Sequence, residues 1–168
     1  FRRVLFRSLK VLIFNPGAAV EGVPLVGKKL SVFDDDMIKY YNYKVELADF
    51  NDSLRCYKFS VKAKNPDDDH AVIKELISYF DRKTFNIIAR KYVVSYHSAP
   101  FDFDVVMEVK LENLSGVLVP VAIAYNGYWD VVFKKSEYVN FKIRFSDFKV
   151  RSEEHTSELQ SRFGISYA

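Results

Sequence analysis

The chain has 168 residues with a formal net charge of +3, and 49% of its residues are hydrophobic. This length fits one domain that can bury a core of its own, and no apolar run approaches the length of a membrane-spanning helix. The single cysteine, Cys56, excludes an internal disulfide and is typical of a reducing compartment.

The two ends of the chain are related to each other through their coding sequences. The codon GAA for Glu158 has the reverse complement TTC, which encodes Phe1, and the same relation holds inward for eight consecutive residues. The residues that follow position 150 also resemble the translation of a sequencing adapter. We therefore exclude both ends from the fold prediction. We expect 1–8 and 151–168 to be adapter-derived artefacts, and 9–150 to be a single domain from a longer protein.

Removing the two ends changes the charge of the chain. The ends hold five arginines and three glutamates, which leaves 20 basic and 19 acidic residues and a net charge of +1. A balance this even predicts no polyanion partner from the overall field, so any attraction to nucleic acid or membrane must come from local clusters.

The first part of the domain predicts short strands joined by loops. An apolar run predicts a strand over 9–14, and glycines and prolines predict a long loop over 15–29. A short strand over 30–33 and a turn of three aspartates follow. Residues 41–47 then alternate between apolar and polar side chains, which predicts a half-buried strand.

The middle of the chain, residues 56–81, predicts a strand, a turn and a helix. Apolar and basic residues alternate up to Lys64, and Asn65 and Pro66 end the strand because proline lacks the ladder donor. Three aspartates then stand where the free N–H groups of a helix start favour acceptors. The apolar residues that follow recur at helical spacing, so we expect the main helix here. The expected core comprises Phe59, Val61, Pro66, Leu76, Ile77 and Phe80, with Val72 and Ile73 on the helical stripe.

Further strands are predicted beyond residue 81 from β-branched and aromatic runs and from alternation with charged residues. A short helix over 83–90 is the alternative to the strand expected at 87–96. Pro120 predicts that the strand expected at 117–125 lies at an edge or contains a bulge. Asn126 followed by Gly127 is typical of a two-residue hairpin turn. The expected fold class is α+β, a mostly antiparallel sheet with one main amphipathic helix packed on a face. The strands are expected at 87–96, 103–111, 117–125, 128–133 and 139–145.

No group of residues in the domain has the pattern of a catalytic, metal or cofactor site. His97 lies near Asp102 and Asp104 in the sequence, but this spacing matches no recognised set of metal ligands. The two runs of three aspartates lack the glycine and distal glutamate of a calcium-binding loop. Cys56 has no partner base nearby, which favours a buried thiol over a nucleophile. We therefore expect a protein that is not an enzyme and takes no metal, cofactor or small-molecule substrate.

Basic residues on two predicted strands form the candidate binding surface. Bases and tyrosines also mix over 39–44, a composition that can hold single-stranded RNA, although alternating tyrosines on a strand are first of all a core face. A basic sheet face would attract phosphate groups or anionic lipid, and its ordinary alternative is a solvated strand face. The residues of this face are Lys58, Lys62, Lys64, Lys142 and Arg144.

The middle of the chain carries a series of features in the order of one known family. Basic residues alternate along the strand 58–62, Pro66 follows it, and 78–81 places an aromatic residue and then an acidic one at a helix end. Residues 91–96 would form the next core strand. This series resembles the rhabdovirus matrix proteins, whose basic arm and late motif have no counterpart here, so no functional residue of that family is carried over.

The resemblance implies a non-enzymatic viral assembly protein. Such a protein self-associates, binds the viral ribonucleoprotein and coats the anionic inner leaflet of the membrane, in the virion and in the host cytoplasm. The alternative is a virion-coat or extracellular β-sandwich binding module. Topology distinguishes the two, because a lone helix across one face of a sheet favours the matrix protein and two stacked sheets favour the binding module.

Overall fold

The computed structural model describes the chain from residue 31 onward with three short gaps. The strand and the loop expected before residue 30 lie outside the described residues. The short strand expected at 30–33 is wrong, because Asp34 N donates to the carbonyl of Ser31 at 3.0 Å and residues 32–34 turn. The described ranges are 31–51, 54–98, 101–153 and 156–166.

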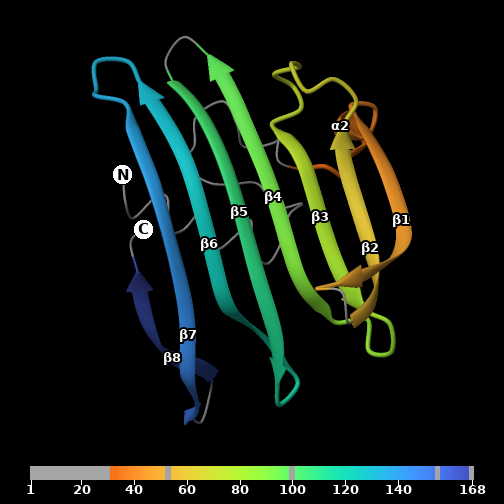
Figure 1. Cartoon of the computed structure of the whole chain (residues 1–168), viewed down its shortest axis with the longest axis vertical. Coiled ribbons are helices and arrows are strands. Elements are labelled where there is room, and N and C mark those ends of the chain that lie inside the picture. Colours follow the sequence, from red (N-terminus) through yellow and green to blue (C-terminus); the bar gives the residue numbers. More distant parts are fainter. Residues whose placement is uncertain (1–30, 52–53, 99–100, 154–155, 167–168) are drawn as a thin grey trace.

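Eight strands form one antiparallel sheet in which each strand pairs with its neighbours in the sequence (Figure 1). A single helical turn, α2 (Asp35–Ile38), precedes the first strand. None of the helices in the described part of the chain has the length and hydropathy of a membrane span. The strands are β1 (Tyr41–Phe50), β2 (Leu54–Ala63), β3 (Ile73–Asp81), β4 (Ile87–Ser98), β5 (Phe101–Leu114), β6 (Val117–Val131), β7 (Glu137–Glu153) and β8 (Thr156–Ser166).

The main helix expected in the middle of the chain is wrong, because these residues form strand β3, which pairs with β2 and β4. The isoleucines and aromatics of β3 favour a strand, and nine residues are too few for a helix that is stable without tertiary packing. In the described residues no helix packs on a face of the sheet. The fold is therefore an antiparallel β-sheet and not α+β.

A bulge in β3 explains why its apolar residues have the spacing of a helix. Ile73 lies opposite Val94, but Glu75 lies opposite Val93, so one extra residue is inserted between them. The extra residue brings Ile73 and Leu76 to the same face although they are three positions apart. A spacing of three is also the spacing of a helical stripe, so periodicity alone cannot separate the two structures here.

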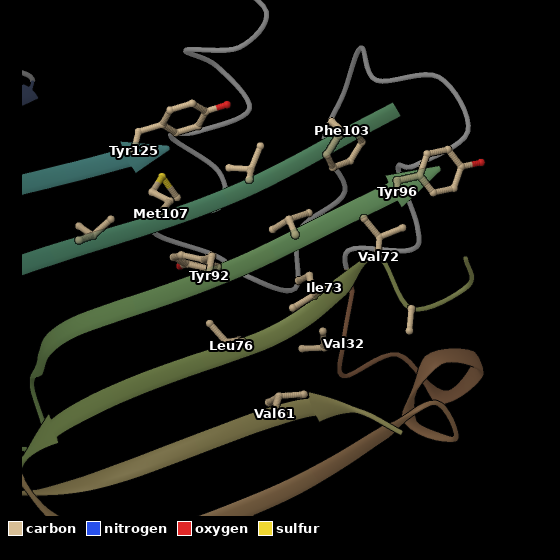
Figure 2. Close-up of a cluster of buried hydrophobic side chains, with 14 of the residues drawn as sticks. Val32, Val61, Val72, Ile73, Leu76, Tyr92, Tyr96, Phe103, Met107 and Tyr125 are labelled. Carbon is tan, nitrogen blue, oxygen red and sulfur yellow. The ribbon is translucent and has the colours of Figure 1, made fainter. Parts of the chain in front are cut away.

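One face of the sheet carries the hydrophobic core, and we call it the inner face. Val61, Leu76, Tyr92, Met107 and Tyr125 lie opposite one another in direct register from β2 to β6. Each of these side chains is at most 2% exposed, and Figure 2 shows them as a row across the strands. The opposite, outer face carries most of the charged side chains of the same strands.

The remaining residues expected in the core lie at different depths. Ile77 is buried on the outer face, because it follows Leu76 directly along the strand. Phe59 packs against the core and is half-buried, and Phe80 is also half-buried. Pro66 is exposed in the loop between β2 and β3, so it ends the strand without packing.

The hairpin expected at Asn126 and Gly127 is also wrong, because β6 continues through both residues. Gly127 leaves room for a neighbouring side chain and does not form a turn. A Cβ atom on Gly127 would lie 2.6 Å from the hydroxyl oxygen of Tyr125. Trp129 Nε1 donates to that hydroxyl at 2.8 Å, and the Tyr125 ring stacks on Phe141 with centroids 4.9 Å apart. Glycine leaves the space in which the Tyr125 ring lies.

Strands β4 and β6 agree with what the sequence predicts at residue 87 and at Pro120. The strand expected from residue 87 is β4, which excludes the alternative helix over 83–90. The bulge expected at Pro120 is confirmed, because Lys110 lies opposite Ala122 and Leu111 lies opposite Pro120, which leaves Val121 of β6 as the extra residue.

The end of the chain lies at the edge of the sheet opposite β1. Strand β8 pairs with β7, from Lys142 opposite Ser166 to Glu153 opposite Thr156. The adapter-derived origin of 151–168 concerns the coding sequence, so it stays a prediction.

Candidate functional site

The inner face of β1 exposes apolar side chains at the edge of the sheet. Tyr43, Val45 and Leu47 lie directly opposite inner-face residues of β2. Their exposed fractions are 37%, 66% and 58%, whereas the residues at the centre of the same face are buried. Gathered apolar side chains on a surface mark a binding site more often than scattered ones. With Phe33, which is 49% exposed, they form what we call the β1 patch.

Three stacked rings hold one end of the β1 patch in place. The Phe33 ring centroid lies 6.2 Å from that of Tyr43 and 6.1 Å from that of Phe59. The Tyr43 hydroxyl also donates to the carbonyl of Val32, and partial burial raises the pKa of this hydroxyl. Rings fixed in this way lose little conformational freedom when a partner covers them.

The backbone of β1 has a free edge beside the β1 patch. β2 pairs with all ten residues of β1 on one side. On the other side no strand pairs with β1 in the part of the chain that the structure describes (Figure 1). The N–H and C=O groups along such an edge can accept an additional strand. The site therefore combines backbone donors and acceptors with an apolar surface.

Charges of both signs lie on the outer face of β1. Lys44 Nζ lies 2.5 Å from Glu46 Oε2, and Lys58 Nζ of β2 lies 3.1 Å from Glu46 Oε1. Hydrogen bonds from Lys44 and Lys58 lower the pKa of the Glu46 carboxyl group. Beside its free edge, β1 thus presents one cation and one anion two residues apart.

Each lysine in the first part of the predicted basic surface has a polar partner. Lys58 is paired with Glu46, and Lys62 Nζ lies 2.9 Å from Glu75 Oε1. Lys64 Nζ donates to a backbone carbonyl, that of Lys39, at 2.8 Å. Exposed ion pairs contribute little to stability, but the carboxylates of Glu46 and Glu75 offset part of the positive charge that would attract phosphate.

The second part of the predicted basic surface is remote from the first. Lys142 and Arg144 belong to β7, which lies five strands from β2. At about 4.8 Å between strands this separation is roughly 24 Å. The register places them on the same outer face as Lys58, with Glu108 of β5 between them. Lys91 of β4 and Lys110 of β5 also lie on this face between the two parts, so the basic residues are spread across the sheet instead of gathered at one place.

A polar cluster lies at the end of the β4–β5 hairpin. Ser95 lies opposite Asp104, and His97 lies opposite Asp102. Ser95 Oγ donates to Asp104 Oδ1 at 2.5 Å and lies 3.0 Å from His97 Nε2. Because the serine proton is donated to a carboxylate, the imidazole is not placed to remove it as a general base. Among the described residues no group of histidine, cysteine and carboxylate side chains is arranged to hold a metal ion.

Cys56 lies in β2 as a buried thiol. Its Sγ lies 3.4 Å from the carbonyl of Ala48, and burial raises the pKa of the thiol. A protonated, buried thiol is a poor nucleophile, so this cysteine has a packing role.

A small hollow lies beside the β6–β7 hairpin. Its volume is about 70 Å³, whereas small-molecule sites usually measure about 300–1,000 Å³. This hollow is too small to enclose a metabolite. It is lined by Trp129, Val131, Lys134, Lys135 and Glu137.

Comparisons of the chain with protein families, with curated proteins and with solved structures found no match. The resemblance to rhabdovirus matrix proteins therefore stays a prediction from the sequence. The features of this chain that indicate a function all lie on β1. They are the β1 patch, the free edge and the charges of the outer face.

Proposed function

We propose that this chain is a non-enzymatic assembly protein that binds a polypeptide strand along the free edge of β1. The observation that carries the proposal is the exposure of Tyr43, Val45 and Leu47 beside that edge. An added strand would gain main-chain hydrogen bonds from the edge. Its apolar side chains would cover the β1 patch and remove that surface from water.

The assembly role agrees with the self-association that the matrix resemblance implies. The ribonucleoprotein and membrane contacts have less support, because Lys58 and Lys62 are already ion-paired. The helix that would favour a matrix protein over a β-sandwich is a strand, and the described residues form one sheet instead of two stacked sheets. Protein binding at β1 is the part of the expected function that the geometry supports best.

Strand peptides test this proposal directly. One fluorescein-labelled peptide carries the ten residues of β1, and a second keeps the same apolar positions with the polar residues shuffled. We expect the full chain to bind at least one peptide in a fluorescence anisotropy titration. Val45→Lys should raise the Kd at least about tenfold, because a charge on the apolar face of an edge strand opposes pairing.

A matched control separates the edge from general surface charge. Val117→Lys adds the same charge at a valine that is 48% exposed at the start of β6, away from β1. This variant should bind the peptides as the unchanged chain does. If neither peptide binds, or if both variants weaken binding equally, the proposal is wrong.

A further inference from the structure

We infer that the strand added to β1 is β1 of a second copy of this chain, paired antiparallel about Val45 so that Lys44 lies opposite Glu46 of the copy. This inference rests on the proposed function and names its partner. The result would be a two-fold dimer in which two sheets join edge to edge. Two-fold pairing is the commonest closed form of self-association, because one surface then supplies both halves of the interface.

The faces of the two sheets restrict the pairing. In an antiparallel pair of strands, the residue numbers of any two opposite residues have the same sum, and this constant defines the register. An odd constant would place the apolar residues of one copy on the outer face of the other, because side chains alternate between faces. Only an even constant joins the two β1 patches into one surface. The constant of 90 does so symmetrically, since it places Val45 opposite Val45.

The charges of β1 then select one register among the even ones. With the constant of 90, Lys44 lies opposite Glu46 in both halves of the dimer, and Tyr43 lies opposite Leu47. A shift of two residues in one direction places Lys44 opposite Lys44. The same shift in the other direction places Glu46 opposite Glu46. Opposite charges across a strand pair are favourable and like charges are unfavourable, so both shifted registers are penalised.

The second copy fits this edge better than a strand without charges would. Glu46 already accepts hydrogen bonds from Lys44 and from Lys58 of its own chain. The Lys44 of the copy would extend this network on the outer face, while Val45 and Leu47 are covered on the inner face. β1 therefore complements itself in charge and in hydrophobicity, in a single arrangement.

Two single charge reversals test the register. Lys44→Glu makes both charged positions on the outer face of β1 negative, and Glu46→Lys makes both positive. Each variant alone should dimerise at least about tenfold more weakly than the unchanged chain, since every cross-strand charge pair becomes repulsive. An equimolar mixture of the two variants should regain dimer, because each negative position then faces a positive one. Sedimentation velocity of the full chains measures this, with one variant fluorescently labelled to identify the heterodimer.

The outcomes distinguish the inference from the proposed function. Recovery of dimer in the mixture, with both single variants weakened, supports pairing about Val45; it also shows that both variants are folded. A chain that stays monomeric at every concentration but binds the strand peptides overturns this inference and leaves strand binding at β1 intact. A dimer that persists in Val45→Lys and in Lys44→Glu places self-association on another surface and overturns the inference as well. A monomeric chain that binds neither peptide overturns both.

Discussion

The centre and the β1 edge of the inner face have the same sequence pattern and opposite environments. In β5, Phe103, Met107 and Val109 alternate with charged residues and are buried. In β1, Val45 and Leu47 alternate with charged residues in the same way and are mostly exposed. A period of two identifies the face to which a side chain belongs. It does not identify the depth, because depth depends on how many neighbouring strands surround the residue.

The largest contrast is expected between two leucines on the inner face. Leu76→Ala at the centre should cost about 2–5 kcal/mol in the free energy of unfolding, because Leu76 is 1% exposed and its removal leaves a cavity. Leu47→Ala at the edge should cost no more than about 0.5 kcal/mol, as is usual for exposed positions. Urea titration of both variants measures the difference. Similar losses in the two variants would remove the distinction between centre and edge.

Alkaline pH should affect the centre of the face through Tyr125. Burial raises the pKa of Tyr125 to about 12, from an ordinary value of 10.0. Between about pH 10 and about pH 12 the unfolded chain therefore releases a proton that the folded chain keeps. The free energy of unfolding falls across this interval, by roughly 2–3 kcal/mol, and is unaffected by Tyr125 below it.

Urea titrations at about pH 8 and about pH 11 test this expectation. Tyr125→Phe has no hydroxyl to ionise, so it should be less sensitive to this change of pH than the unchanged chain. Equal sensitivity in the two chains would show that Tyr125 ionises as readily in the folded state as in the unfolded one.

The packing of the centre can also be broken by a single methyl group. Gly127→Ala should cost about 1–3 kcal/mol, because the new Cβ would meet the Tyr125 ring. In a Tyr125→Val background, where the ring is gone, the same glycine substitution should cost much less. A double-mutant cycle from urea titrations gives the coupling energy. A cycle without coupling would mean that Gly127 has a role other than leaving space for the ring.

The smallest effect is expected at the edge opposite β1. Removing 1–8 and 151–168 together should change the Tm by no more than about 2 °C, because their predicted adapter origin makes these sequences independent of the fold. β8 also contacts only one neighbouring strand, β7. Thermal unfolding of the shortened and full chains provides the measurement. A loss of several degrees would show that this edge contributes to the fold in spite of its origin.

The sequence predicts the strands of this protein better than their arrangement. Alternation finds β1, β5 and much of β7 because none of these strands has an extra residue in its alternating part; the extra residue of the β5–β6 pair belongs to β6. The same rule fails at β3, where the bulge between Ile73 and Glu75 shifts the period toward that of a helix. It also fails at Gly127, where a glycine that accommodates a ring has the sequence of a turn.

The candidate site could be predicted only in part. Alternation in the sequence places Tyr43, Val45 and Leu47 on one face, but it assigns that face to the core. Whether β1 is central or at an edge depends on pairings between strands, which composition and periodicity do not encode. The ion pairs of the lysine surface could not be predicted for a related reason. Lys58 and Lys62 are separated in the sequence from Glu46 and Glu75, the carboxylates with which they pair.

The sequential order of the strands has a consequence for how the chain folds. Every strand pairs with the one just before or after it, so each pairing closes only a short loop. Proteins with such local contacts fold faster than β-proteins whose strands pair across long sequence distances. The sheet can grow hairpin by hairpin, and β1 needs only β2 to take its place. The edge that we propose for assembly can therefore form without the far side of the sheet.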